Sequence, residues 1–257
     1  MKICQFLHEN EIKYGAIRGD WVYLFPPPEK MKETSGDLKL DQAIKKSEVQ
    51  FLPPIEPRKI VCVGRNYAEH AKELGNEVPK EPLLFLKAPS AIITDDEPII
   101  IPPQSSQVEH EGELGVVIGK TCKNLSENDN PFDFVMGYVC LNDVTARDLQ
   151  KKDVQFSRSK SFDTFCPISH FFETEIDVSD IRVTTRVNGV IKQDGRTSQM
   201  VFPVPFLIRY ISNQMSLHYG DIIATGTPAG VSKLQAGDVC EVEIEGVGIL
   251  RNPVISS

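Results

Sequence analysis

The 257-residue sequence predicts an α+β fold dominated by a mixed β-sheet that is rolled up or closed into a barrel. Three observations lead to this prediction. Short apolar segments with strand-like composition recur along the whole chain, and helical segments are few. The strands also do not alternate regularly with long helices, as they would in a doubly wound parallel sheet.

The first 57 residues are expected to form a small N-terminal domain with a linker, and residues 58–257 the main domain. Two strand-like stretches, ICQFLHEN and YGAIRGDWVYLF, open the chain with turn signals between them. A polar stretch, EKMKETSGD, and a short amphipathic piece, LDQAIKK, follow. The proline-rich segment FLPPIEPRK then reads as the linker.

The main domain contains most of the predicted strands. They are expected in the segments KIVCVG, AIIT, PIIIP, ELGVVIG, FVMGYVCL, IRVTTRV, DIIATG and CEVEIEG. Asn188-Gly189 predicts a type I′ hairpin turn. Helices are expected in NYAEHAKELG, which Gly75 would end, and in VTARDLQKKD and VPFLIRYISNQM.

Composition excludes several classes of partner. The formal charge is −8 and no Lys/Arg cluster is visible, so no nucleic-acid partner is expected. The apolar runs are too short for a membrane-spanning helix, and charge appears too early for a secretory signal, which predicts a cytoplasmic protein. The six cysteines form no CxxC pair and are expected to be reduced, mostly buried thiols. A catalytic cysteine is the weaker alternative, because no Cys/His constellation accompanies it.

The motif Glu109-His110-Glu111-Gly112-Glu113 precedes the apolar run LGVVIG. Side chains alternate along a strand, so the three glutamates would share one face. At about 4 Å and an effective dielectric constant of about 20, each like-charged pair costs roughly 4 kcal/mol. Exposure to water, protonation of one carboxyl group or a bound cation would relieve this cost. A solvated acidic strand end and a metal site both remain open.

A second motif, GYVCLNDVTARDLQ, places Asp143 at the end of an apolar strand. With Glu111 and Glu113 it would supply three oxygen ligands, which suit Mg²⁺ or Mn²⁺. The structural alternative is helix capping, either by Asn142 or Asp143, or by a capping box of Thr145 and Asp148.

Two further segments carry candidate catalytic groups. His70 and Glu73 lie three residues apart on one helix face, where the carboxylate can orient the histidine as a general base. An exposed helix of mixed charge explains this spacing as well. Lys160, in SRSKSFDTFCPIS, could hold a substrate carboxylate or stabilise an oxyanion, or be a surface lysine.

The segment DIIATGTPAGV predicts a strand that runs into a tight turn. Thr225, Thr227 and the backbone N–H groups near Gly226 could cradle a carboxylate there. The segment lacks the GK[ST] of a phosphate loop, and a plain turn is the alternative.

Six stretches in this order resemble the fumarylacetoacetate hydrolase family, and they span residues 60 to about 254: VGRNYAEHAKELG, EHEGELGVVIGK, GYVCLNDVTARDLQ, KSFDTFCP, VNGVIKQDGRTSQMVF and HYGDIIATGTPAGV. The resemblance implies a mixed β-roll with a small N-terminal domain, in a homodimer. It implies roles for nine residues: Glu111, Glu113 and Asp143 as ligands of Mg²⁺ or Mn²⁺, His70, Glu73 and Lys160 as catalytic groups, and Arg65, Gln150 and Thr227 as substrate contacts. Glu109 and His110 are not expected to be ligands. The stretch ISHFF after Pro167 departs from the Gly-Pro that many members have there, so one wall of the pocket is expected to differ from theirs.

The resemblance implies Mg²⁺-dependent hydrolysis of a C–C bond in a small 2,4-dioxo acid of the acylpyruvate or fumarylpyruvate type. Hydrolysis is preferred because activation of water needs a base, which His70 and Glu73 provide. The alternative is an isomerase or decarboxylase of the same family, acting on a 2-hydroxyhepta-2,4-diene-1,7-dioate or on oxaloacetate. A non-catalytic β-rich protein, with a structural Ca²⁺ or with no metal, is the alternative from another class.

Overall fold

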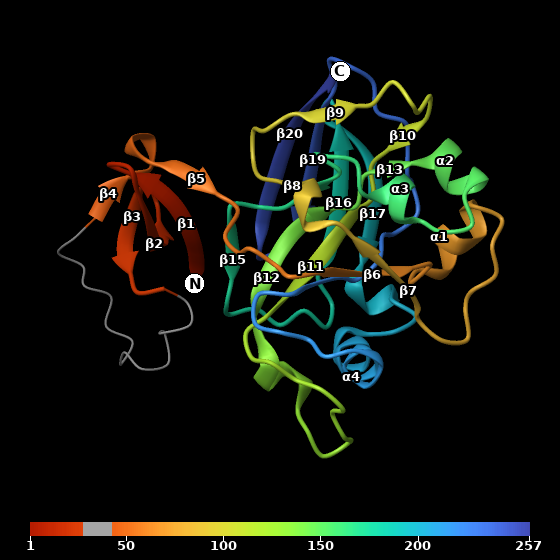
Figure 1. Cartoon of the computed structure of the whole chain (residues 1–257), viewed down its shortest axis with the longest axis horizontal. Coiled ribbons are helices and arrows are strands. Elements are labelled where there is room, and N and C mark those ends of the chain that lie inside the picture. The colour runs from red at the N-terminus through yellow and green to blue at the C-terminus, as the bar shows by residue number, and fades with distance from the viewer. Residues whose placement is uncertain (28–42) are drawn as a thin grey trace.

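The computed structural model describes residues 1–27 and 43–257. In these residues the larger sheet has eleven strands (Figure 1). Ten of them lie in the order β4 (Ala43–Lys45), β3 (Trp21–Phe25), β2 (Glu11–Arg18), β1 (Lys2–His8), β15 (Phe171–Glu173), β12 (Val135–Asn142), β11 (Gly112–Ile118), β18 (Ile222–Ala224), β6 (Ile60–Gly64) and β7 (Leu83–Lys87), and β5 (Gln50–Leu52) pairs with β1. Only β18 and β6 are parallel neighbours in this sheet, which is therefore mixed.

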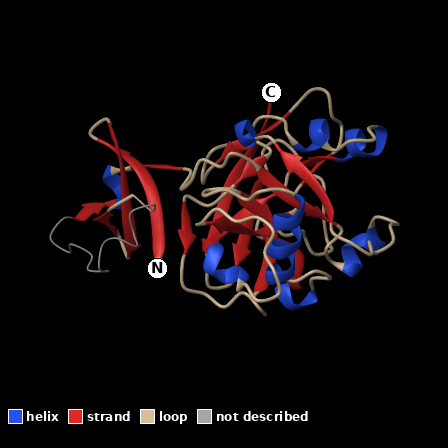
Figure 2. Ribbon diagram, turned by 60° about the horizontal axis from the view of Figure 1, so that its bottom comes forward, coloured by secondary structure: helices blue, strands red, loops and turns tan. Residues whose placement is uncertain are grey.

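A second sheet has five strands among the described residues. Their order is β17 (Val190–Arg196), β16 (Arg182–Val187), β19 (Val239–Ile244), β20 (Gly248–Ser256) and β9 (Ile99–Ile101). Two short pairs complete the strands: β10 (Val108–Glu109) with β13 (Thr145–Ala146), and β14 (Cys166–Pro167) with β8 (Ile92–Ile93). The α-helices lie around the outside of the strands (Figure 2): α1 (Ala68–Glu73), α2 (Arg147–Lys152), α3 (Ser157–Lys160) and α4 (Val204–Gln214).

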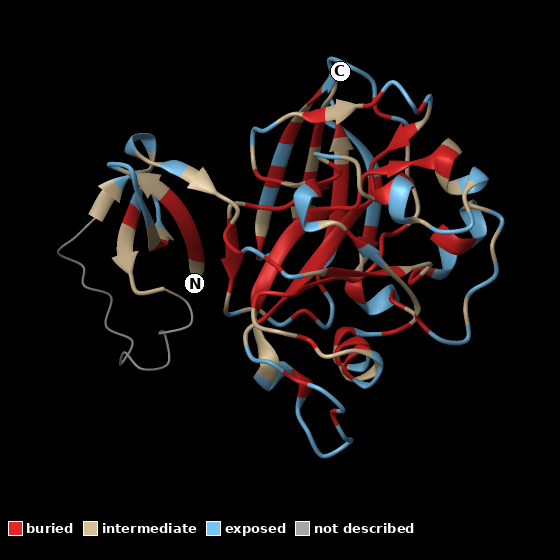
Figure 3. Ribbon diagram, in the orientation of Figure 1, coloured by how far each residue is buried: buried red, intermediate tan, exposed pale blue. Residues whose placement is uncertain are grey.

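The two-residue period of β11 separates the core into two clusters of apolar side chains. Leu114 and Val116 belong to the cluster that also contains Val183 and Val242 of the second sheet. Val117 points to the other cluster, which contains Ile99 and other residues of the loops and edge strands. Both faces of β11 are thus buried, as Figure 3 shows for the centre of the molecule. This burial holds the strand that carries the acidic motif rigidly in place.

The first strands extend the sheet of the main body. Strand β1 pairs antiparallel with β15, with Ile3 opposite Phe172, and the amino group of Met1 forms an ion pair with Glu173. In Figure 1, β1–β5 stand beside the rest of the strands. The polar stretch and the first part of the amphipathic piece lie outside the described residues, and Ala43–Lys45 within that piece forms β4. The domain boundary at residue 57 stays a prediction.

The predicted fold class is confirmed, with the larger sheet open between β4 and β7 in the described residues, not closed into a barrel. Every predicted strand segment contains a strand, and each predicted helix is present but shorter than its segment. Asn188 and Gly189 have φ angles of 53° and 78°, as a type I′ turn requires. The six cysteines are buried and free. Among the described residues, no helix is long and apolar enough to cross a membrane.

Asn66 fixes the connection between β6 and α1. Its side chain is fully buried, donates to the carbonyl groups of Phe202 (3.1 Å) and Thr225 (2.7 Å), and accepts from the N–H of Phe202 (2.8 Å). One amide thus joins the chain beside Arg65 to the turn after β18.

We expect Asn66→Ala to lower the free energy of unfolding by about 3 kcal/mol, because it leaves buried backbone groups without partners. Urea denaturation monitored by circular dichroism measures this change. Asn128→Ala, at an exposed position, is the matched control and should change the stability by less than about 0.5 kcal/mol. An Asn66→Ala protein as stable as the control would contradict the anchoring role.

Candidate active site

Three buried carboxylates converge where β11 and β12 run side by side. Glu111, Glu113 and Asp143 each offer an oxygen atom, and these atoms lie within 4.8 Å of one another. The register places Gly112 opposite Asn142, so the ends of the two strands bring the acidic residues together. The side chain of Asn142 accepts a hydrogen bond of 2.9 Å from the N–H of Glu111, which fixes the backbone there.

Three cations surround these carboxylates. Lys160 Nζ lies 2.7 Å from Glu111 and 2.6 Å from Asp143, and so bridges them. Lys87 Nζ is 2.6 Å from the other oxygen of Asp143. Arg147 forms an ion pair with Glu111 and another, of 2.7 Å, with Glu109. Four carboxyl groups therefore face three cations, and the cluster has one excess negative charge when all four are ionised.

The pKa values differ strongly between the two glutamates. Burial alone would raise the pKa of Glu111, but the charges of Lys160 and Arg147 outweigh it and hold this pKa well below the usual range. The pKa of Glu113 is raised well above its usual value by burial, and further by the charges of Asp143 and Glu111. Glu113 receives one hydrogen bond, of 2.8 Å, from the N–H of Gly226.

The donor set fits a divalent cation such as Mg²⁺ or Mn²⁺. It consists of hard carboxylate oxygens, which these ions prefer over nitrogen or sulfur. Glu113 is the member of the trio without an ion pair among the described residues, and its raised pKa means that it holds a proton more readily than Glu111 does. A bound cation beside Glu113 would favour its ionised form, which burial and the charges of Asp143 and Glu111 otherwise disfavour. Glu111, Glu113 and Asp143 are therefore the residues that would hold such an ion.

His70 and Glu73 form a hydrogen-bonded pair on α1. His70 is only 4% exposed, and its Nδ1 lies 3.3 Å from Glu73 Oε2. Glu73 in turn accepts from the N–H of Gly230 at 3.0 Å. Gly230 thus fixes Glu73, and Glu73 orients the ring through Nδ1, which leaves Nε2 as the atom able to exchange a proton. The structural alternative, an exposed helix of mixed charge, is wrong for His70, because this side chain is buried.

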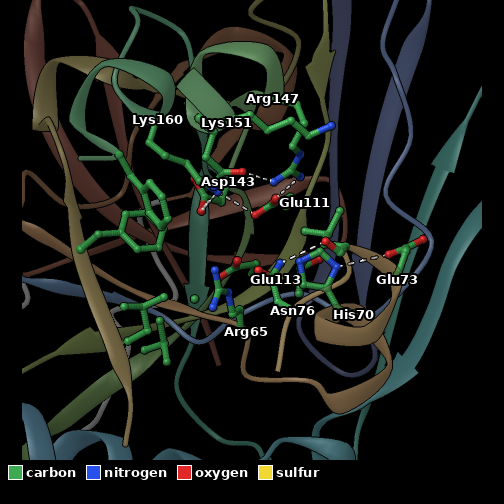
Figure 4. Close-up of a pocket in the computed structure, with 18 residues that line it drawn as sticks. Arg65, His70, Glu73, Asn76, Glu111, Glu113, Asp143, Arg147, Lys151 and Lys160 are labelled. Atoms are coloured by element: carbon green, nitrogen blue, oxygen red, sulfur yellow. Dashed lines mark hydrogen bonds and ion pairs between the residues drawn. The ribbon is translucent and has the colours of Figure 1, made fainter. Parts of the chain in front are cut away.

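One cavity of about 370 Å³ joins the carboxylates to this pair (Figure 4). The structure brings all nine predicted site residues to its wall: Arg65, His70, Glu73, Glu111, Glu113, Asp143, Gln150, Lys160 and Thr227. Apolar side chains line another part of the wall: Val63, Leu74, Leu83, Phe85 and Phe156. None of the residues 168–172, the ISHFF stretch, is among the lining residues.

The turn after β18 holds a carboxylate of the protein itself. Gly226, at a φ of 97°, directs its N–H to Glu113, and a Cβ there would lie 2.7 Å from the Cβ of Asn66. Thr227 donates to the carbonyl group of Gly112 at 2.8 Å, and Thr225 to that of Leu114 at 2.8 Å. Of the groups expected to cradle a carboxylate, the N–H of Gly226 does so, whereas the two threonines bond backbone carbonyl groups and anchor β11.

Several structural alternatives from the sequence are wrong. Ala146 is the N-cap of α2 and makes no side-chain hydrogen bond there, so neither Asn142 nor Asp143 caps this helix. Asp148 instead accepts from Ser105 at 2.6 Å. Lys160 is 1% exposed and is not a surface lysine.

The sequence did not point to three buried polar residues of the site. Lys87 ends β7 and reads as an ordinary strand end, and Arg147 lies in a helix segment of mixed charge. Gln193 receives a hydrogen bond of 2.9 Å from Gly112 and donates one of 2.7 Å to Thr227. The one available signal was a lysine at the end of the apolar run LLFL, and a lysine there indicates a buried partner only once the strand is known to be covered.

Comparison with known proteins supports a family assignment. The fumarylacetoacetate (FAA) hydrolase C-terminal family model matches residues 59–255. An archaeal protein of Methanocaldococcus jannaschii is 54% identical over 78% of this chain and 84% of its own. A mitochondrial oxaloacetate decarboxylase of Dictyostelium discoideum is 47% identical, over 74% and 90% of the two chains. An oxaloacetate tautomerase of Bacillus subtilis is 41% identical, over 81% and 74%.

Solved structures agree with the whole fold. A fumarylacetoacetate hydrolase of Exiguobacterium antarcticum superposes with a TM-score of 0.88 at 39% identity over 100% of both chains. A 5-carboxymethyl-2-hydroxymuconate delta-isomerase of Mycobacterium smegmatis has a TM-score of 0.88 at 36% identity, over 100% of this chain and 99% of its own. A maleylpyruvate hydrolase of Sphingobium, solved with manganese(II) and pyruvate, has a TM-score of 0.84 at 28% identity over 100% of both chains. This chain belongs to the fumarylacetoacetate hydrolase family.

Proposed function

We propose that this chain is a metal-dependent enzyme that forms the enolate of a small 2-oxo carboxylic acid, with oxaloacetate as its first candidate substrate. One observation carries the proposal: the buried trio Glu111, Glu113 and Asp143 shares a cavity with the hydrogen-bonded pair His70 and Glu73. The trio can hold a divalent cation, and the pair can move a proton. Enolate formation needs both abilities in one cavity.

The residues divide the chemistry between them. Mg²⁺ or Mn²⁺, when bound by the trio, would supply Lewis acidity toward a 2-oxo oxygen. His70 would remove or return the proton at C3, and Glu73 would hold its ring in one orientation. Lys160 would place its positive charge beside the developing oxyanion. Arg65, Gln150 and Thr227 would orient the substrate from the cavity wall.

The curated relatives favour oxaloacetate as the substrate. Two of them, at 47% and 41% identity, are an oxaloacetate decarboxylase and an oxaloacetate tautomerase. In tautomerisation, a proton leaves C3 and one is added to the 2-oxo oxygen. In decarboxylation, the C3–C4 bond breaks, CO₂ leaves, and the enolate of pyruvate takes up a proton at C3. The same proton-moving pair serves both reactions.

The second candidate is the hydrolysis of an acylpyruvate, which the sequence analysis preferred. A base next to the metal site is what activation of water needs, and two solved structures of the same fold are named as hydrolases. Here water adds to the C4 carbonyl group and the C3–C4 bond breaks, which gives a carboxylic acid and the enolate of pyruvate. We also keep as predictions the preference for Mg²⁺, a homodimer and a cytoplasmic location.

We expect chelator-treated protein to be inactive, and added Mg²⁺ to restore turnover of oxaloacetate. The assay compares oxaloacetate, acetylpyruvate, fumarylpyruvate and a 2-hydroxy-dienedioate by ultraviolet absorbance. Faster metal-dependent cleavage of an acylpyruvate would move the assignment to the hydrolase. Turnover of none of the four, together with a melting temperature that responds to metal, would contradict an enzymatic role and favour a structural ion.

We expect His70→Asn to lower kcat by about 10²–10⁴-fold, because it removes the general base. The affinity for Mn²⁺, measured by isothermal titration calorimetry, should stay close to that of the original protein, since His70 is not among the ligands. Glu69→Gln, on the exposed face of the same helix, is the matched control and should leave kcat unchanged. A fully active His70→Asn protein would exclude this pair from the reaction.

We expect Glu113→Ala to weaken Mn²⁺ binding at least about 100-fold and to abolish turnover, because the variant removes one of three ligands. Glu109→Gln is the control, since Glu109 is buried nearby but bonded to Arg147 and Gln107, and it should bind Mn²⁺. Calorimetric titration measures both variants. An active Glu113→Ala enzyme without bound metal would refute the metal assignment.

A further inference from the structure

The basic side chains of the cavity fall into two groups. Besides His70, four of them line its wall: Arg65, Arg147, Lys151 and Lys160. Arg147 and Lys160 form ion pairs with carboxylates of the protein. Within residues 1–27 and 43–257, no ion pair or side-chain hydrogen bond occupies Arg65 or Lys151. Two cationic side chains of this cavity therefore form no ion pair with the described part of the chain.

These two residues stand on different walls. Arg65 follows β6 in the left-handed region, at a φ of 57°, a conformation that is uncommon for a residue with a side chain. Lys151 lies in the last turn of α2, beside Gln150. Figure 4 shows Arg65 on one side of the carboxylates and Lys151 on the other. Because Lys151 is exposed whereas Glu113 and Asp143 are at most 2% exposed, Lys151 marks the mouth of the cavity and the trio marks its base.

The charges of the cavity residues indicate how many carboxylates a fitting substrate carries. When all four buried carboxyl groups of the cluster are ionised, they exceed its three cations by one negative charge. A divalent ion together with the 1-carboxylate of a 2-oxo acid brings this balance to zero. Outside this cluster, Arg65 and Lys151 remain as cations of the wall without an ion pair in the described residues, and Glu73 is bonded to His70 and Gly230. A substrate whose reacting end lies at the base extends its other end toward the mouth.

We propose that the site prefers 2-oxo acids with a second carboxylate, and that Lys151 determines this preference by binding that carboxylate at the mouth of the cavity. The inference rests on the proposed function, since it takes the 2-oxo carboxylate to lie at the trio. The site would therefore bind dicarboxylates such as oxaloacetate more tightly than monocarboxylates such as acetylpyruvate, whichever bond of the substrate is broken.

An alternative role for Lys151 is the stabilisation of a helix end. Lysines in the last turn of a helix interact favourably with its dipole, and Lys152 is equally placed for this role. Lys152 is exposed as well but does not line the cavity. The two neighbouring lysines thus form a matched pair that separates ligand binding from a helix-end effect.

The test is calorimetric titration of Mg²⁺-loaded protein with two ligands of equal chain length, 2-oxoglutarate and 2-oxopentanoate. They differ in whether a carboxylate or a methyl group ends the chain. Neither has a carboxylate or carbonyl group on C3, so neither offers the bond that decarboxylation or hydrolysis would break. We expect the original protein to bind 2-oxoglutarate about fivefold more tightly, the effect of one partly exposed ion pair.

Lys151→Met should remove this difference by weakening 2-oxoglutarate alone, and Lys152→Met should keep it. Equal affinities for both ligands in the original protein would overturn the inference and leave the proposed function standing. An unchanged preference in Lys151→Met, or the same loss in Lys152→Met, would overturn it as well. Binding of neither ligand to the Mg²⁺-loaded protein would contradict the proposed function itself.

Discussion

Burying Glu111, Glu113 and Asp143 side by side is unfavourable unless opposite charge surrounds them. The chain supplies that charge from three separate segments: Lys87 from β7, Arg147 from α2 and Lys160 from α3. Each of these segments must therefore approach the ends of β11 and β12. This electrostatic requirement therefore determines the positions of α2 and α3 and of the part of the cavity wall that they form.

The local features of the site could be predicted from the sequence. The spacing of Glu111 and Glu113 and the position of Asp143 after an apolar strand placed three carboxylates at neighbouring strand ends. The continuous apolar run LGVVIG likewise indicated a strand, which the structure shows to be buried on both faces. The partners could not be predicted, because Lys87 and Arg147 reach the carboxylates through tertiary packing of residues 36–56 positions away. For the same reason, the sequence around Asn142 was open to a capping interpretation that the structure excludes.

The pairing order of the strands could also not be predicted from the sequence. Periodicity identifies a strand, but it does not identify the neighbour of that strand. Strand β18 lies between β11 and β6, and β15 lies between β1 and β12. Such an order depends on which apolar faces fit together over the whole body. The prediction of a mixed roll was therefore correct in class, whereas the sheet edges at β4 and β7, open in the described part of the chain, became visible only in the structure.

Strand order also has a consequence for how the protein is made. The parallel partner of β6 is β18, which pairs Ile60 with Ile222, and β1 has its neighbour at Phe171–Glu173. A chain leaving the ribosome therefore exposes the apolar faces of its early strands until residues near 222 have emerged, at a synthesis rate of about 5–20 residues per second. Pairing across such sequence distances is slow, because loop-closure entropy is lost before any contact forms. The nascent chain is thus prone to aggregation for roughly ten seconds or more. During this time its exposed apolar strands are the surfaces that holdase chaperones can bind.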